Sequence, residues 1–567
     1  MKNRASGDVL RAIPLGGHGE IGKNSWLFEY KDEIIIVDFG MMLPGNDLSG
    51  VDLVLPSANY LADNQEKIKG LILTSACDET CGGVFYLLEK VKIPYVWGSK
   101  LAIENVKLQL SKKIKMPDYE YLEPRKVFQV GSGFSIKPIQ NTSIVPDSFG
   151  LFIQTSSGNV LYTSSFKVDQ TPLDNALLDY FSYSQAGEDG VDLLISDSSN
   201  IESPGFTQSE CFITKRFKEL IKEMQSKLII FSYASNIHKF QIIFNLVQKN
   251  NKRILLSGDY LKMKVEAAIN AGMLNVDNKL FVDEKEIDKV KDNELVILAS
   301  GKYGNFLSAL IEVAKQEHPL IKLKPKDVIV VSADPPPGTA RILAHTIDQL
   351  FVQKVQVVGG KGQGVHVLGH AACEETKFML TVSKPRSFVP SHGEERHLVL
   401  YGNIAESINI NSNDIHILKN GDVLELREQV ARVANKIPAQ SIYYNQAKGL
   451  DIDEITMKER QTLSEEGSIT IALAFDNERN IVAGPEIFAE GCSFAKGKDW
   501  RAFCLGAVEL VKDAIKQSLA RDEKELLSLK SIVRDTVNKS VLELVGRRPL
   551  INVSIQEIQE TISSKSL

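Results

Sequence analysis

The chain is poor in the features that mark secreted, membrane-spanning or strongly basic proteins. Six cysteines scattered over 567 residues do not form a disulfide framework, so we expect a reducing cytoplasm. No apolar run approaches the roughly 20 residues that a membrane helix needs, so we expect no membrane partner. The start, MKNRASGDVLRAIPLGG, has no apolar signal-peptide segment. With a formal net charge of -6, a nucleic-acid ligand would need a local basic channel.

The order of apolar runs predicts several α/β domains. In the first part, EIIIVDFG and VDLLISD are typical of strands, and SFGLFIQTSSGN followed by NVLYTSSF is typical of a hairpin. From about residue 211, strands such as KLIIFSYAS and RILLSGDY alternate with helical stretches, which indicates βαβ units on a parallel sheet. After about residue 450, GSITIALAF, AVELVKDAIKQSL and INVSIQEI predict a small α/β domain.

The stretch LILTSACDETCGG, residues 71–83, has the frame of a metal-binding strand end. A short apolar strand runs into a Thr, polar residues follow at alternate positions, and a Gly pair closes the turn. Yet the stretch contains no histidine. It is either a metal site with unusual ligands or a former site whose ligands have been replaced.

Seven motifs in order resemble one family. They are GGHGEIGKN (16–24), VDLVLPSANYL (51–61), FKVDQTP (166–172), SDSSN (196–200), ASNIHK (234–239), VHVLGH (365–370) and PSHGEERH (390–397). With IVAGPEIFAEG and RRPLINV near the end, they make the chain similar to bacterial ribonuclease J over nearly its whole length.

This resemblance implies an α/β fold with three parts. They are a metallo-β-lactamase αββα sandwich, an inserted β-CASP domain with a parallel sheet, and a small α/β C-terminal domain. The expected boundaries are 1–210 and 361–447 for the sandwich, 211–360 for the β-CASP domain, 448–462 for a linker and 463–567 for the C-terminal domain.

The family cleaves RNA with two divalent ions, zinc or manganese, that activate a water and clamp the phosphate. The resemblance places its seven metal ligands at positions where this chain keeps one, His392. The other six positions hold Ser75, Cys77, Glu79, Thr80, Ser143 and Ser165. Neutral hydroxyls are poor ligands beside imidazole or carboxylate, so we expect the two-ion centre to be lost and no cofactor to bind.

A single zinc site built from Cys77, Glu79, Cys81 and His392 is the alternative. Cys81, however, stands at an apolar position of the family, which favours a small buried residue. The replacements are small and polar, which suits a wet cleft without ions. Restoring His at 75, 77, 80 and 143 and Asp at 79 and 165 is expected to rebuild metal binding if the fold is intact.

The positions that match the family's RNA contacts are better kept. By the resemblance, Asp197 and His370 correspond to acid–base residues. The positions matching nucleotide or phosphate contacts are Ser235, Asn236, His238, His366, Val367, Leu368, Gly369 and His370. Leu368 stands where the family has Ser, and SGKYGNF (300–306) replaces a Gly-Ser-Gln-Gly-Glu-Pro turn. Each of these His and Asp residues could equally be structural, as a helix cap or a core histidine.

Three functional hypotheses follow. The chain is expected to be a ribonuclease J-like protein of RNA decay and processing with a degenerate site, which binds RNA or supports an active ribonuclease J. Family members form dimers and tetramers, and some bacteria carry a second paralogue with eroded motifs, so a homo-oligomer or a heteromer is expected. The alternative is an active metal-dependent exoribonuclease or endoribonuclease with an atypical site, or one using His370, His392 and Asp197 without metal. A third hypothesis is an RNA-binding or regulatory protein without a ribonuclease partner.

Overall fold

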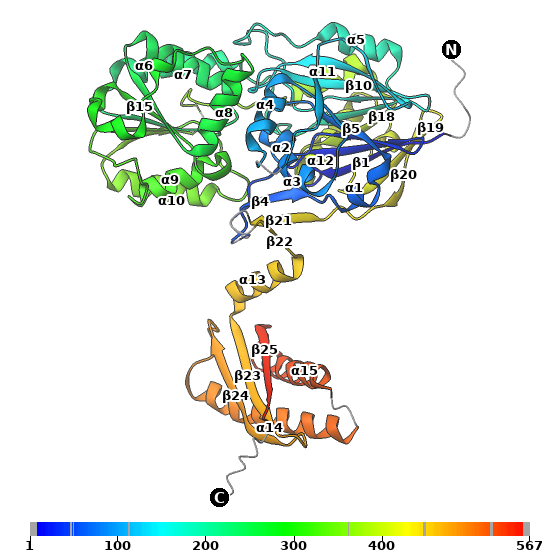
Figure 1. The fold of residues 1–567 in the computed structure, drawn as a ribbon, viewed down its shortest axis with the longest axis vertical. Helices are drawn as coiled ribbons and strands as arrows, with labels where there is room; N and C mark the ends of the chain where they lie inside the picture. The colour runs from blue at the N-terminus through cyan, green and yellow to red at the C-terminus, as the bar shows by residue number, and fades with distance from the viewer. Residues whose placement is uncertain are drawn as a thin grey trace, which may run out of the picture. The chain divides into compact units, whose positions relative to one another are not determined.

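The structure is a computed structural model that describes residues 8–45, 48, 50–111, 114–360, 362–445, 449–521 and 525–558. It divides into two units, a larger one within residues 1–450 and a smaller one of residues 451–567 with 47–50. Each unit is described by itself, and Figure 1 labels the elements of both.

The central strands of the first sheet of the larger unit are apolar, and their side chains are buried on both faces. The sheet has eight strands in the order β20-β19-β1-β2-β3-β5-β6-β7. β1, β2 and β3 are antiparallel neighbours, whereas β3, β5, β6 and β7 run parallel. The strands are β1 Leu10–Gly16, β2 Ser25–Tyr30, β3 Glu33–Val37, β5 Ile68–Leu73, β6 Tyr95–Gly98, β7 Asp118–Tyr121, β19 Asp422–Arg427 and β20 Val430–Lys436.

The second sheet has six strands in the order β18-β12-β11-β10-β9-β8. The strands are β8 Phe128–Val130, β9 Phe134–Asn141, β10 Ser148–Gln154, β11 Asn159–Tyr162, β12 Leu193–Asp197 and β18 Ser387–Ser391. β10 and β11 form the hairpin that the sequence predicts. β12 ends at Asp197 and pairs in parallel with β18, so Asp197 lies opposite Ser391, next to His392.

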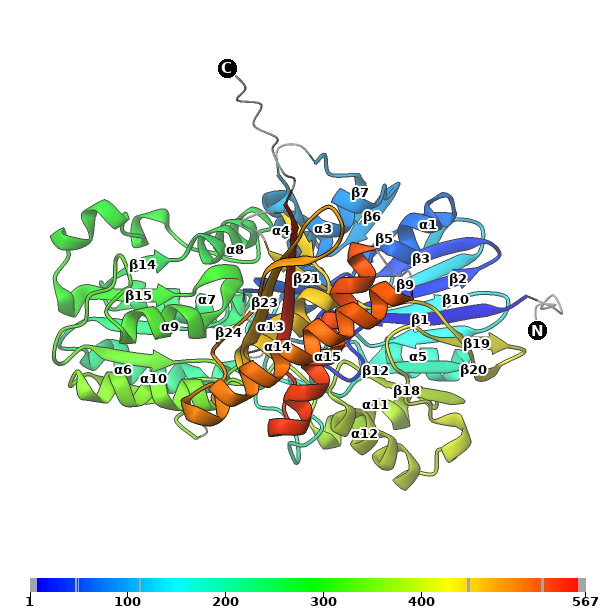
Figure 2. The same cartoon turned by 90° about the horizontal axis from the view of Figure 1, so that it is seen from below.

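The two sheets pack face to face, and helices cover both outer faces. Trp26, Phe28, Ile35, Phe149 and Leu151 lie between the sheets with at most 1% of their surface exposed. Figure 2 shows α3 and α4 beside β5–β7, and α5, α11 and α12 beside β12 and β18. This is the expected αββα arrangement. The helices are α1 Asn59–Asp63, α2 Asp78–Cys81, α3 Val84–Lys90, α4 Lys100–Gln109, α5 Tyr180–Asp189, α11 Cys373–Ser383 and α12 Glu395–Ser407. A short ladder pairs β4 Leu53–Pro56 with β21 Ser441–Asn445.

A second, parallel-sheet domain is inserted into the sandwich between β12 and β18. Its five strands lie in the order β14-β15-β13-β16-β17 and all pair in parallel. Figure 1 shows α6, α7 and α8 on one face and α9 and α10 on the other. The elements are α6 Ile213–Glu223, β13 Leu228–Phe231, α7 Ile237–Lys249, β14 Arg253–Ser257, α8 Asp259–Asn270, β15 Leu295–Ala299, α9 Phe306–Ala314, β16 Val328–Val331, α10 Ala340–Val352 and β17 Gln356–Gly359.

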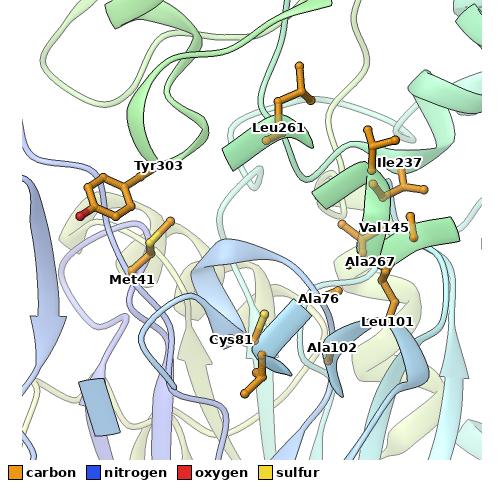
Figure 3. Packing of buried hydrophobic residues seen from close by; sticks show 14 of the residues in the cluster. Met41, Ala76, Cys81, Leu101, Ala102, Val145, Ile237, Leu261, Ala267 and Tyr303 are labelled. Carbon is orange, nitrogen blue, oxygen red and sulfur yellow. The ribbon is translucent and has the colours of Figure 1, made fainter. Parts of the chain in front are cut away.

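The sandwich and the parallel-sheet domain share one apolar cluster. Ala76, Cys81 and Leu101 of the sandwich belong to the same buried cluster as Leu261 and Ala267 of α8. Figure 3 shows these side chains between the two domains. The strand end and turn at residues 71–83 therefore lie where the two domains meet.

The smaller unit is a three-stranded sheet in the order β24-β23-β25 with two long helices packed on one face. Its elements are α13 Glu454–Glu466, β23 Ser468–Phe475, β24 Ile481–Glu490, α14 Gly497–Ala520, α15 Leu526–Val545 and β25 Leu550–Glu557. Residues 448–462, predicted as a linker, hold β22 Leu450–Ile452 and most of α13. Among the described residues, no helix is both long and apolar enough to cross a membrane.

Leu529 carries the packing of α15 in the smaller unit. It is fully buried, whereas Leu527, two residues earlier on the same helix, is 80% exposed. Leu529→Ala is expected to destabilise this unit by about 2–5 kcal/mol, because it removes buried methyl groups and leaves a cavity. Leu527→Ala is expected to change the free energy of unfolding by less than about 0.5 kcal/mol. Urea unfolding followed by circular dichroism measures both, and equal shifts would contradict the packing described.

Candidate functional site

The turn after β5 is held by the carboxylate of Asp38, at the end of β3. The backbone N–H of Thr74 donates to Asp38 Oδ1 at 2.8 Å, and the Thr74 hydroxyl donates to Oδ2 at 2.7 Å. A side chain at Gly40 would lie 1.7 Å from the carbonyl oxygen of Glu79, so the turn passes directly over the end of β3. The backbone of the predicted metal turn is therefore fixed by Asp38 and by close backbone approach.

His392, the one retained ligand, is engaged inside the protein. The hydroxyl of Tyr162, at the end of β11, donates to Asp38 Oδ2 at 3.1 Å and lies 3.0 Å from His392 Nε2. His392 is 1% exposed. Its burial lowers its pKa to about 4 against the opposing charge of Asp197, so the imidazole is neutral at pH 7. Burial raises the pKa of Asp38 to about 7, although Thr74 and Tyr162 donate to the carboxylate.

The sequence predicts that the hydroxyl residues at the replaced ligand positions line a wet cleft. This prediction is wrong. Ser75, Thr80, Ser143 and Ser165 are all buried, with between 0% and 9% of their surface exposed. The Thr80 hydroxyl donates to the carbonyl of Ser75 at 3.0 Å, and Ser75 Oγ lies 3.1 Å from Ser148 Oγ. The two hydroxyls that lie in the turn are thus absorbed into the hydrogen bonding of the core.

The two cysteines of the turn have different surroundings. Cys81 is fully buried in the apolar cluster shared by the two domains, as the sequence predicts (Figure 3). Cys77 is half-buried and lines the cleft described below. Burial raises the pKa of the Cys81 thiol to about 12 and that of Cys77 well above its usual value, with Glu79 and Asp78 adding to the effect for Cys77. Burial thus disfavours the thiolate, which is the form of cysteine that binds a metal.

Buried Asp197 and partly exposed His370 form a close pair. His370 Nδ1 lies 2.7 Å from Asp197 Oδ2, and Nε2 lies 3.9 Å from Glu79 Oε2. Burial opposes the charged imidazole, but the charge and hydrogen bond of Asp197, with the charge of Glu79, outweigh it and raise the pKa of His370 to about 9. Burial likewise opposes the charged form of Asp197, but the contact with His370 lowers its pKa nonetheless. At pH 7 His370 is therefore an imidazolium ion.

A cleft of about 520 Å³ opens between the sandwich and the parallel-sheet domain. Among the RNA-contact positions predicted from the sequence, those that line it are Ser235, Asn236, His366, Leu368, Gly369 and His370. Met41, Met42, Leu43 and Tyr303 give it an apolar wall. The structure thus brings together residues from both domains that are far apart in the chain.

Three of the predicted positions have structural contacts. His238 points to Asp174, with 3.2 Å between Nε2 and Oδ2, and is not among the residues that line the cleft. Val367 is buried in the apolar cluster that the two domains share. Asn236 lines the cleft but caps α7 through Lys239 N and donates to Glu210 Oε1 at 3.1 Å.

Sequence reasoning missed two lysines. Lys239 lines the cleft, donates to the Ser332 carbonyl at 2.6 Å and lies 3.2 Å from His366 Nδ1. Burial lowers its pKa to about 8. Its place in the motif ASNIHK could have drawn attention to it.

The second is Lys264 of α8, whose Nζ lies 2.6 Å from Asp78 Oδ1. Asp78 belongs to the metal-like turn. It also accepts a hydrogen bond of 2.6 Å from the Tyr260 hydroxyl. No signal in the sequence pairs residues that are 186 positions apart.

The residues present do not fit a two-ion centre. Two adjacent cations need several anionic or imidazole donors, and the described residues include no group of three or more His, Cys, Asp or Glu arranged to hold an ion. His392 Nε2 faces the phenol of Tyr162. The single zinc site is not supported either, because Cys81, one of its four ligands, lies in the apolar cluster.

Comparison with known proteins agrees with this architecture. Residues 225–350 match the family model "Ribonuclease J, beta-CASP domain", and residues 455–558 match "Ribonuclease J C-terminal domain". The chain is 36% identical to Ribonuclease J of Synechocystis sp. over 87% of this chain and 77% of that protein. It is 32% identical to Ribonuclease J2 of Bacillus subtilis over 98% of this chain and 100% of that protein. A crystal structure of a protein of unknown function from Enterococcus faecalis is similar in fold, with 14% identity, a TM-score of 0.51, and coverage of 74% of this chain and 100% of that one.

The sandwich is a metallo-β-lactamase fold, and the inserted parallel-sheet domain is a β-CASP domain. The chain belongs to the ribonuclease J family. The fold and the family that the sequence predicts are therefore confirmed.

Proposed function

We propose that this chain is a ribonuclease J family member without hydrolytic activity of its own. It binds RNA and acts in RNA decay and processing as a partner of an active ribonuclease J. The observation that carries the proposal is the state of the seven ligand positions. Six are replaced, and the seventh, His392, is hydrogen-bonded to Tyr162.

The remaining acid–base groups do not replace the metal chemistry. His370, protonated and paired with Asp197, could donate a proton to a leaving group. General acid–base catalysis alone supplies about 10²–10⁴-fold, whereas enzymes accelerate reactions by about 10⁶–10¹⁷-fold. The described residues also offer no group that would activate a water by metal coordination. Proton transfer by His370 therefore falls short of phosphodiester hydrolysis.

The cleft keeps cationic groups that suit a phosphate. His370 lines the cleft, and its Nε2 lies 3.9 Å from Glu79 Oε2, beyond hydrogen-bond distance. Arg396, whose side chain is 58% exposed, also lines the cleft, as does Gly369. Most contacts between proteins and nucleic acids go to phosphate and sugar through such groups. These features support RNA binding without cleavage.

A partner role is supported by what the chain has kept. The β-CASP and C-terminal domains match their family models although the metal ligands are replaced. The smaller unit still has a buried core of its own in β23, β25, α14 and α15. A chain without any remaining function would not need this folded unit, whereas a chain that binds a partner through the unit would need it.

The first test is hydrolysis of 5′-monophosphorylated RNA with Mn²⁺, using protein from a host that lacks its own ribonuclease J. We expect no release of mononucleotides, because the ligands for two ions are absent. Release that disappears with His392→Ala would instead support the active nuclease with an atypical site. An active ribonuclease J assayed in parallel on the same RNA shows that the substrate is competent.

RNA binding and partner binding are tested separately. If His370 and Arg396 contact phosphates, the logarithm of the affinity for single-stranded RNA should fall with the logarithm of salt with a slope of about −1.4. A chain that shows no affinity for RNA at low salt would contradict the binding role. Affinity purification from the native host should recover an active ribonuclease J, and recovery of this chain alone would contradict the partner role. RNA affinity without any co-purifying nuclease would favour the regulatory hypothesis.

A further inference from the structure

The Tyr162 hydroxyl lies where an ion bound to His392 would have to be. It is 3.0 Å from His392 Nε2. A metal ion bound to an imidazole nitrogen lies about 2.1 Å from that nitrogen. An ion on the line between the two atoms would therefore lie within about 1 Å of the phenol oxygen, which is far too close.

The hydrogen bonds of Tyr162 also leave His392 Nε2 without the lone pair that a metal would use. Tyr162 has one hydroxyl proton, and it donates that proton to Asp38 at Oδ2, 3.1 Å away. The contact with His392 then requires the neutral imidazole to donate from Nε2. In that tautomer Nε2 carries a proton and has no free lone pair for an ion.

Tyr162 has little room to move aside. It is fully buried and belongs to the apolar cluster between the two sheets. Asp38, its acceptor, is in turn held by the backbone N–H and hydroxyl of Thr74.

We propose that Tyr162 closes the former metal site independently of the six replaced ligands. The inference rests on the proposed loss of the metal centre. It adds the Tyr162 side chain to the six replaced ligands as a cause of that loss. Restoring the six ligand types is then insufficient to rebuild metal binding, contrary to the expectation from the sequence. The Tyr162 side chain must be replaced as well.

The test compares Mn²⁺ binding by two restored proteins, measured by titration with electron paramagnetic resonance. Both carry Ser75→His, Cys77→His, Glu79→Asp, Thr80→His, Ser143→His and Ser165→Asp. One keeps Tyr162, and the other adds Tyr162→Gln, which is shorter and still polar. We expect the protein with Gln to bind Mn²⁺ about tenfold or more tightly than the protein with Tyr. Equal affinities would overturn the proposal.

A second measurement on the unmodified chain does not depend on whether the restored proteins fold. At pH 8, where Asp38 with its pKa of about 7 is mostly ionised, nitrogen-15 NMR of labelled histidine should show His392 as the Nε2–H tautomer. Loss of the signal in His392→Gln identifies it, and the Nδ1–H tautomer would overturn the proposal. A failure of the proposed function and a failure of this inference give different results. Mn²⁺ bound by the unmodified chain would contradict the proposed function. If the unmodified chain does not bind Mn²⁺ but the restored protein with Tyr162 binds it as tightly as the one with Gln, only this inference is contradicted.

Discussion

Lys264→Met is expected to destabilise the larger unit by about 3–5 kcal/mol, because it leaves the Asp78 carboxylate without its cation. Lys264 is 1% exposed, and its Nζ lies 2.6 Å from Asp78 Oδ1 and 3.3 Å from the Ala76 carbonyl. The pair joins the β-CASP helix α8 to the turn of the metallo-β-lactamase domain. Urea unfolding of the full chain measures the change.

Lys262 of the same helix provides the matched control. It is 40% exposed and pairs with Glu284 at the surface. Lys262→Met is expected to cost no more than about 1 kcal/mol, since exposed ion pairs contribute little. Similar losses for the two variants would show that the buried pair does not join the domains as described.

His370→Gln is expected to remove a stability loss that the unmodified chain shows at alkaline pH. The folded pKa of His370 is about 9, above its ordinary value of 6.5. Its contribution is therefore complete below pH 6.5 and is lost as the pH rises from 6.5 to 9. A shift of this size corresponds to about 3 kcal/mol. Urea unfolding at pH 6.5 and pH 9 gives the two free energies.

His345→Gln is the control for this experiment, because His345 lies exposed on α10. It should keep the same fall in stability between pH 6.5 and 9 as the unmodified chain. If His370→Gln keeps that fall as well, the pairing of His370 with Asp197 is not its cause.

The sequence predicts the fold well because its signals are local. The hairpin of β10 and β11, the parallel strands of the β-CASP domain and the replaced ligands are all visible as runs and motifs. The site is harder, because its contacts join distant residues. Tyr162 meets His392 across 230 positions, and Asp38 across 124, so no pattern along the chain shows that a phenol faces the retained histidine. The burial of the replacing hydroxyls was likewise set by the packing of two sheets and not by residue type.

The close approach of Gly40 to the Glu79 carbonyl limits how the sequence of this turn can vary in evolution. Its path depends on glycines and on Asp38, with backbone contacts that no ion supplies. The backbone of the turn can therefore persist without an ion, whereas a side chain at Gly40 would collide with the Glu79 carbonyl. Natural variation should accordingly be narrow at Gly40.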